Sequence, residues 1–181
     1  MSIRLAITGD APTTGEGEAV AFARLYQEHL DGVFNYCVYR VGDPVAAEDL
    51  TADIFERAWR ARRRYSPGQG KFSTWLYTIA RRRVIDWQRR QARRRTVVLD
   101  EQLASSLPGP EALSAEAEDR RRLRQLVQDL PEVDQELIAM KFGAGMTNRD
   151  IAALLGKSES AVGSAVFRLV RKLRTLWEET R

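Results

Sequence analysis

The chain has 181 residues and a mass of 20.6 kDa, enough for one ordinary domain or two small ones, and its 44% hydrophobic and 30% charged residues are typical of globular proteins. The chain has a single cysteine, Cys37, and a single histidine, His29. These numbers exclude an internal disulfide framework and a structural zinc site. They also argue against a catalytic relay of Ser, His and Asp or of Cys and His, so we do not expect an enzyme. No apolar run reaches the roughly 18–20 residues that cross a bilayer, and residues 1–17 lack the apolar segment of a secretory signal, so we expect a cytoplasmic protein without membrane insertion.

The net charge of +4 is distributed very unevenly along the chain. Residues 1–56 and 96–119 are acidic, whereas residues 57–95 hold 14 basic side chains and one acidic one, Asp86. Nearly all the basic side chains are arginines, which bind phosphate in a fork and stack on bases. A block of this charge predicts a polyanionic partner, and a merely solvated basic face is the weaker interpretation.

Three helices are predicted in the first half of the chain. Residues 1–17 are unpatterned and rich in Gly, Thr and Pro, which indicates a disordered tail. Apolar residues recur at helical spacing over 18–40, 44–64 and 72–94, with a Pro- and Gly-rich loop at 66–70. Asp43 precedes Pro44 as an N-cap, and His29 and Cys37 fall on the apolar stripe of the first helix, where we interpret them as packed helix residues.

The second half of the chain is also predicted to be helical. The acidic segment 96–118 lacks a sustained period and contains two prolines, which marks a linker. Helices are then expected over 119–129, 132–142, 148–155 and 159–178, and no strand pattern is present. The predicted fold class is therefore all-α, with two small helical domains, at 18–95 and 119–181, joined by an acidic flexible linker.

The last two predicted helices have the spacing of a helix-turn-helix. Ala152 is small where the helices would cross, Gly156 permits a left-handed turn, and Val162 would anchor the second helix on the first. Ser158 would cap a helix whose exposed first turns can enter a major groove. Candidate side chains for duplex DNA are Ser158, Glu159, Ser160, Ser164, Arg168, Arg171 and Lys172.

Aromatic residues interrupt the basic block in a way that suits single-stranded nucleic acid. Phe72, Leu76 and Ile79 fit one inward stripe of the predicted helix, whereas Tyr77 and Trp87 fall off that stripe, among arginines. Exposed rings beside phosphate-binding arginines offer a stacking surface for unpaired bases. The residues alone thus predict a two-module DNA-binding protein, with one module for melted strand and one for duplex.

Several segments are similar to those of a known family. Residues 47–59 (AEDLTADIFERAW) resemble the core-polymerase-binding segment of bacterial RNA polymerase sigma factors of the sigma-70 family. Residues 72–81 (FSTWLYTIAR) resemble the promoter-melting segment, and 84–87 (VIDW) continue into the segment that meets the −10 element. Residues 130–174 resemble the domain that reads the −35 element. The chain therefore resembles the small extracytoplasmic-function (ECF) group of that family.

The resemblance implies roles for residues that the patterns alone do not assign. It makes 18–95 sigma domain 2 and 119–181 sigma domain 4, and it adds Gly163 and Phe167 to the −35 contacts. The polymerase-binding residues that it implies are Asp49, Leu50, Asp53, Phe55 and Trp59. Those implied for the −10 element and melted strand are Lys71, Phe72, Trp75, Tyr77, Arg81, Arg82, Arg83, Asp86, Trp87 and Arg90.

The implied function is promoter-specific transcription initiation as a dissociable subunit of RNA polymerase, without cofactor, metal or catalysis of its own. The implied partners are core RNA polymerase, through its clamp and flap regions, and promoter DNA, and an anti-sigma factor is left open. A helix-turn-helix regulator acting on duplex DNA without polymerase is the alternative, and it would give residues 44–64 no role. An RNA-binding protein would leave the helix-turn-helix spacing unexplained.

Overall fold

The structure, a computed structural model, describes residues 15–98 and 115–179, and every regular element within them is helical, as predicted. The N-terminal unit contains α1 (Gly15–Val41), α2 (Pro44–Ala61) and α3 (Phe72–Val98), with short 3₁₀ turns η1 (Arg62–Arg64) and η2 (Pro67–Gln69) between α2 and α3. The C-terminal unit contains α4 (Ala115–Gln128), α5 (Glu132–Ile138), a π-helical turn η3 (Ala139–Gly143), α6 (Asn148–Leu155) and α7 (Glu159–Glu179).

Three helices extend beyond their predicted bounds by three or more residues, and the predicted helices 44–64 and 132–142 end earlier, in the turns η1 and η3. Helix α1 begins at Gly15, so residues 15–17 are helical rather than part of a tail. Helix α3 continues to Val98 and α4 begins at Ala115, so both ends of the expected linker are helical too. Glu118 and Asp119 follow the new start of α4, and acidic side chains near a helix N-terminus favour the helix. The other residues of the expected tail and linker, 1–14 and 99–114, lie outside the described residues.

The turn between α1 and α2 is determined by its local sequence. Gly42 adopts a positive φ of 75°, beside the side chain of Gln128 in α4. The carboxylate of Asp43 then accepts a hydrogen bond from the backbone N–H of Val45 at 3.0 Å, which caps α2 as expected. Glycine adopts the conformation of this turn without the strain that a Cβ atom would add.

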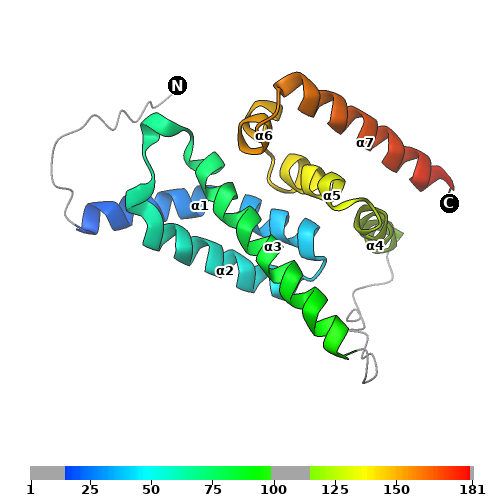
Figure 1. Cartoon of the computed structure of the whole chain (residues 1–181), viewed down its shortest axis with the longest axis horizontal. Helices are drawn as coiled ribbons and strands as arrows, with labels where there is room; N and C mark the ends of the chain where they lie inside the picture. Colours follow the sequence, from blue (N-terminus) through cyan, green and yellow to red (C-terminus); the bar gives the residue numbers. More distant parts are fainter. Residues whose placement is uncertain (1–14, 99–114, 180–181) are drawn as a thin grey trace.

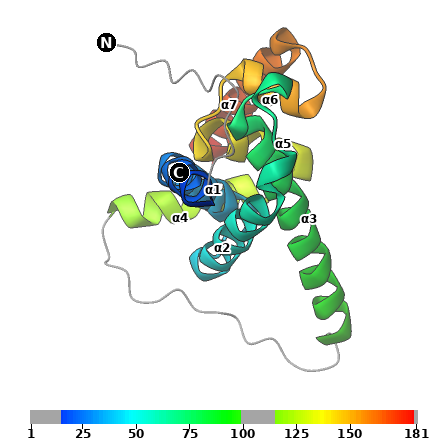
Figure 2. The same ribbon diagram turned by 90° about the vertical axis from the view of Figure 1, so that its left-hand side faces the viewer.

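The two units pack against each other and share one continuous core. Helices α5 and α6 and the turn η3 lie across α1 and the first half of α3 (Figure 1). Fully buried side chains include Val33, Ile54 and Leu76 in the N-terminal unit and Met140 and Ile151 in the C-terminal unit. The second half of α3 projects past the other helices, which Figure 2 shows most clearly.

Candidate nucleic-acid interface

An aromatic cluster holds the first turn of α3 in place. Phe72 is 8% exposed, and its ring centroid lies 5.3–6.4 Å from those of Phe22, Tyr65 and Trp75. His29 stacks on the same ring at 5.5 Å, so the only histidine is a packed residue of α1, as the sequence predicted. In this structure Phe72 is a core residue, whereas Trp75 is half-buried at the edge of the cluster.

Tyr77 is buried, and its predicted exposure is wrong. The side chain is 3% exposed, and its ring meets that of Tyr36 edge-on at 5.6 Å. Burial raises the pKa of the Tyr77 hydroxyl well above its usual value. The Tyr77 ring packs on Tyr36 and its hydroxyl lies beside Gly32, so α1 covers a second face of α3. The helical period of α3 alone does not show which of its faces α1 covers.

Several residues of α3 remain accessible, in the half of the helix that projects past the others (Figure 2) and in the turn just before it. Arg82, Asp86 and Arg90 are exposed, and Trp87 is half-buried beside them. Arg83 is largely covered and donates hydrogen bonds to the carboxylates of Asp53 and Asp86. The accessible edge therefore combines exposed arginines with one partly exposed indole, a combination that suits single-stranded nucleic acid.

Two other cationic side chains predicted to bind DNA form ion pairs with carboxylates of the C-terminal unit. Nζ of Lys71 lies 2.8 Å from the Asp150 carboxylate. Arg81 donates two hydrogen bonds to Glu136, at 2.7 and 3.2 Å, in a bidentate pair that raises the pKa of Arg81. Burial opposes the shift at Asp150, but hydrogen bonds from Lys71 and Thr147 lower the pKa of that carboxyl overall.

Helix α2 presents few of its predicted polymerase contacts to solvent. Leu50 and Phe55 are each 4% exposed and belong to the core. Trp59 is half-buried, with the Arg62 guanidinium 3.8 Å above its ring. Asp53 accepts hydrogen bonds from Arg57 and Arg83 and is therefore already engaged within the chain. Asp49 is the exposed acidic residue of the predicted set.

The helix-turn-helix has the local geometry that its spacing predicts. Oγ1 of Thr147 accepts the backbone N–H of Asp150 at 3.1 Å and caps α6, and Gly156 ends that helix with a φ of 64°. Ala152 and Val162 are buried where α6 and α7 meet. Oγ of Ser158 accepts the backbone N–H of Ala161 at 3.2 Å and caps α7.

The first turns of α7 are accessible for DNA. Most of the predicted −35 residues are exposed, Gly163 is half-buried, and the Arg171 guanidinium lies 5.9 Å from the Phe167 ring. The exposed ones are Ser158, Glu159, Ser160, Ser164, Phe167, Arg168, Arg171 and Lys172. Helix α7 therefore presents a polar first turn followed by a basic tail.

The sequence analysis missed a buried polar cluster between the two units. The side chain of Arg40 is only 1% exposed, and it donates to Gln88 at 3.1 Å and to the Glu132 carboxylate at 3.2 Å. Tyr36 is fully buried nearby, and its hydroxyl has no hydrogen-bond partner among the described residues. The sequence held one indication of this cluster, because Arg40 lies four residues after Tyr36 and therefore on the same, largely apolar, face of the helix.

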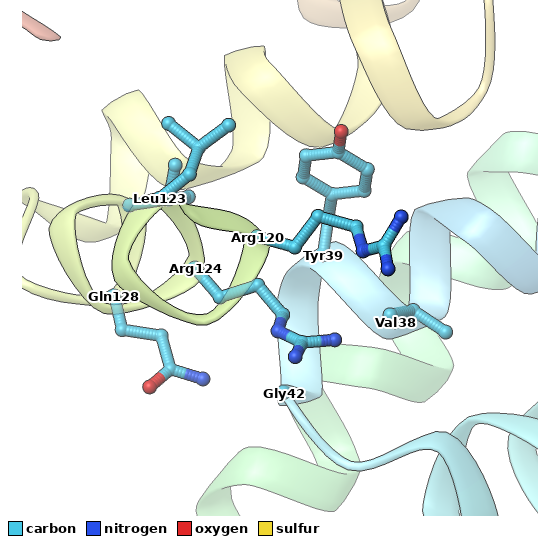
Figure 3. A pocket seen from close by; sticks show the side chains of 8 residues that line it. Val38, Tyr39, Gly42, Arg120, Leu123, Arg124 and Gln128 are labelled. Carbon is cyan, nitrogen blue, oxygen red and sulfur yellow. The ribbon is translucent and has the colours of Figure 1, made fainter. Parts of the chain in front are cut away.

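The described residues contain no other constellation that indicates chemistry. An apolar pocket of about 190 Å³ lies between the end of α1 and α4, lined by Val38 and Leu123 with Arg120 and Arg124 beside them (Figure 3). None of the predicted DNA contacts lines it. Across residues 15–98 and 115–179 there is no metal-ligating cluster of His, Cys, Asp and Glu, and no helix there is long and apolar enough to span a membrane.

Comparisons with known proteins agree with the order of these segments. The family model for Sigma-70 region 2 matches residues 25–94, and that for Sigma-70 region 4 matches residues 120–173. The chain is 35% identical over 162 residues to the ECF RNA polymerase sigma factor BldN of Streptomyces coelicolor, covering 88% of this chain and 61% of BldN. It is 30% identical over 164 residues to the ECF RNA polymerase sigma factor SigL of Mycobacterium tuberculosis, covering 90% of this chain and 92% of SigL.

A solved structure shares the fold. The sigma factor RpoE in complex with the anti-sigma factor NepR from Bartonella quintana superposes with a TM-score of 0.70 at 21% sequence identity, covering 89% of this chain and 99% of RpoE. At this identity the likeness concerns the arrangement of helices. Both helical units thus have counterparts in one known architecture.

Proposed function

The chain belongs to the ECF group of the sigma-70 family of RNA polymerase sigma factors, and from this membership we propose how its two units serve promoter-specific transcription initiation. The observation that carries the proposal is the occurrence, in one chain and in family order, of a basic helix with exposed arginines and a capped helix-turn-helix. The family is non-catalytic, and we propose that polymerase supplies all the chemistry. The chain would act in the cytoplasm, where polymerase and promoters meet.

We propose that the exposed face of α2 binds the core polymerase clamp. Asp49 is accessible there, whereas the Asp53 carboxylate is held by two arginines of the same chain. Charge complementarity at the rim of an interface contributes to association rate and specificity. The opposite side of α2 would hold this face in position by packing into the core through Leu50, Phe55 and Trp59.

Asp49→Arg should weaken binding to core polymerase by at most a few kcal/mol and leave the fold intact, because it reverses an exposed rim charge. Binding is measured by co-elution and by titration of labelled core polymerase. Glu48→Arg is the matched control, since it makes the same change one residue away on an exposed part of the same helix. If both variants lose the same affinity for core polymerase, or if Asp49→Arg loses none, Asp49 has no specific role in the interface.

We propose that the projecting half of α3 holds the melted −10 strand. Arg82 and Arg90 would bind phosphates, and Trp87, which is half-buried, would offer part of its ring to an unpaired base. Lys71 and Arg81 would join this surface only when they are released from Asp150 and Glu136, which pair with them here. Tyr77 is buried against Tyr36 of α1 and does not belong to the accessible surface.

We propose that α7 reads −35 duplex DNA, with affinity from phosphates and discrimination from its first turn. Ser158, Glu159, Ser160 and Ser164 occupy the start of the helix, where side chains reach base edges. Arg168, Arg171 and Lys172 follow and would bind phosphates. Since few direct base contacts are available, DNA shape would supply part of the specificity.

Two substitutions in α7 should separate these roles. Arg171→Ala should weaken binding to all promoters alike and reduce the salt slope by about one. Glu159→Ala should change preference at a single base pair by roughly 1–3 kcal/mol with little effect on the salt slope. Both variants are measured in polymerase holoenzyme across a salt series and a set of single-base promoter variants. Altered base preference in Arg171→Ala with none in Glu159→Ala would contradict this docking of the helix.

We also propose an anti-sigma factor as a partner, because the sigma factor RpoE of Bartonella quintana was solved in complex with one. The alternative, a regulator that binds duplex DNA without polymerase, predicts specific DNA binding by the free chain and no co-elution with core polymerase. Size-exclusion chromatography of the chain with core polymerase, together with duplex binding by the chain alone, distinguishes the two functions.

A further inference from the structure

A small apolar pocket lies where the last turn of α1 faces α4. Its volume is about 190 Å³, and its apolar walls come from Val38 on α1 and from Leu123 and Val127 on α4 (Figure 3). Val127 is buried, whereas Leu123 remains 42% exposed. Part of a large apolar side chain is therefore in contact with water at this pocket, and a bound apolar group that covers it would be stabilised by the hydrophobic effect.

Two cationic side chains stand beside these apolar walls. Arg120 and Arg124 are four residues apart and therefore lie on one face of α4. Figure 3 shows both guanidinium groups extending from α4 toward the end of α1, and both residues line the pocket. Neither guanidinium has an ion-pair or hydrogen-bond partner among the residues that the structure describes. Because like charges at this spacing destabilise a helix, an anion between them would stabilise α4.

The size and charge of the pocket favour a small ligand with an apolar part and one anionic group. An apolar cavity of about 150 Å³ accommodates benzene, so a pocket of about 190 Å³ has room for about six to eight carbon atoms. Guanidinium groups bind a carboxylate through paired hydrogen bonds. Free phosphate would leave the apolar walls uncovered, and a neutral hydrocarbon would leave both arginines unpaired.

A protein partner matches this pocket less well than a small ligand does. A stable protein interface covers roughly 800 Å² on each partner, most of it outside any single small pocket. The more exposed apolar side chains of the chain include Val45, Val133 and Phe142, and none of them lines this pocket. The apolar surface available here is therefore that of the pocket itself, which suits a ligand that the pocket can enclose.

We propose that this pocket binds a medium-chain aliphatic carboxylate, with the alkyl chain against Val38, Leu123 and Val127 and the carboxylate between Arg120 and Arg124. The bound ligand would contact both helical units, because α1 belongs to the N-terminal unit and α4 to the C-terminal unit. None of the residues proposed to bind polymerase or DNA lines the pocket, so this site does not rest on the proposed function.

Isothermal titration of the full chain with octanoate, below the concentration at which octanoate forms micelles, tests the proposal. Octanoate should bind at a single site and about tenfold more tightly than octan-1-ol, because the alcohol has the same chain but lacks the charge that the arginines recognise. Octanoate should also bind at least about tenfold more tightly than acetate, which keeps the carboxylate and lacks most of the apolar chain.

A double variant tests the cationic side of the pocket. Arg120→Gln combined with Arg124→Gln should lower the affinity for octanoate about tenfold and leave the affinity for octan-1-ol unchanged. The matched control is Arg63→Gln combined with Arg121→Gln, which removes the same two charges at exposed positions that do not line the pocket. This control should change the affinity for octanoate by less than about twofold, since exposed charges away from the ligand are largely screened by salt.

A single variant tests the apolar side of the pocket. Leu123→Asn should lower the affinity for octanoate about fivefold, because it replaces apolar surface that the alkyl chain would cover. Val133→Asn introduces the same amide at an exposed position outside the pocket and should leave the affinity unchanged. Circular dichroism checks that each variant is folded, and if Leu123→Asn does not fold, the arginine variants decide the outcome by themselves.

The position of the bound octanoate is measured by the amide resonances of the full chain. The largest shifts should fall within residues 38–42 and 120–128, which line the pocket. The proposal is overturned if the shifts cluster elsewhere, or if the Arg120 and Arg124 double variant binds octanoate as tightly as the unmodified chain, which would indicate an adventitious additive only. Absence of saturable binding also overturns it and leaves the pocket to another occupant, such as an acidic helix of a protein partner.

Discussion

Leu76→Ala should lower the free energy of unfolding by about 2–5 kcal/mol, because Leu76 is fully buried in α3 and its truncation leaves a cavity in a close-packed core. The side chain lies in the N-terminal unit, where α3 packs on both α1 and α2. The loss is a large fraction of the stability of a typical domain. Urea unfolding followed by circular dichroism measures it.

The matched control for Leu76→Ala is Arg82→Ala, an exposed position on the same helix, which should change the stability by less than about 0.5 kcal/mol. A loss below about 1 kcal/mol for Leu76→Ala would mean that α3 does not pack as described. Because the core runs through both units, we expect the destabilised variant to unfold in one transition.

The free energy of unfolding should fall steeply as the pH rises above about 9, because three ionisable groups are buried in their neutral form. Burial raises the pKa of the Cys37 thiol from 9.0 to about 12. Burial also raises the pKa values of Tyr36 and Tyr77, with Glu136 adding to the shift at Tyr36 and Arg40 opposing it. Denaturant titrations between pH 7 and 11 measure the loss.

The direction of this change in unfolding free energy follows from the number of protons that the folded and unfolded states bind. In the unfolded chain the thiol and the phenols ionise at their ordinary pKa values, whereas in the folded chain they keep their protons, so the folded state binds more protons above pH 9. Each group that stays protonated only in the folded state contributes a slope of up to about 1.4 kcal/mol per pH unit. Stability is therefore fully present below the unfolded pKa values and is lost above them.

Tyr36→Phe identifies one of these groups. The Tyr36 hydroxyl is buried without a hydrogen-bond partner among the described residues, so its removal should not weaken the fold at neutral pH and should reduce the alkaline slope. Identical alkaline slopes for Tyr36→Phe and the unmodified chain would contradict the burial of Tyr36.

The helices could be predicted closely because their signals are local. Asp43 caps α2, Thr147 caps α6 and Gly156 ends it, each through contacts within a few residues. The exposed first turns of α7 could be predicted for the same reason, since the capping residue and the buried anchor belong to the adjacent turn and helix. Sequence patterns within a few residues therefore predict caps, turns and helix ends that form within a few residues.

The contacts between the two helical units could not be predicted because they join residues far apart in the chain. Arg81 and Glu136 are 55 positions apart, and Lys71 and Asp150 are 79 apart. Helical periodicity identified one inward stripe on α3 and left Tyr77 outside it, but Tyr36 of α1 packs on that face as well. The side chains that we propose for DNA binding could therefore be predicted as residue types, while their surroundings depended on the tertiary fold.

Run-off transcription with purified core polymerase tests most directly whether this chain directs promoter-specific initiation. The template is a library of duplexes with randomised −35 and −10 segments, and the transcripts are sequenced. The account predicts transcripts with defined start sites that require both the chain and core polymerase and that enrich particular bases in both segments. No transcript above the level of core polymerase alone, together with specific duplex binding by the free chain, would contradict it.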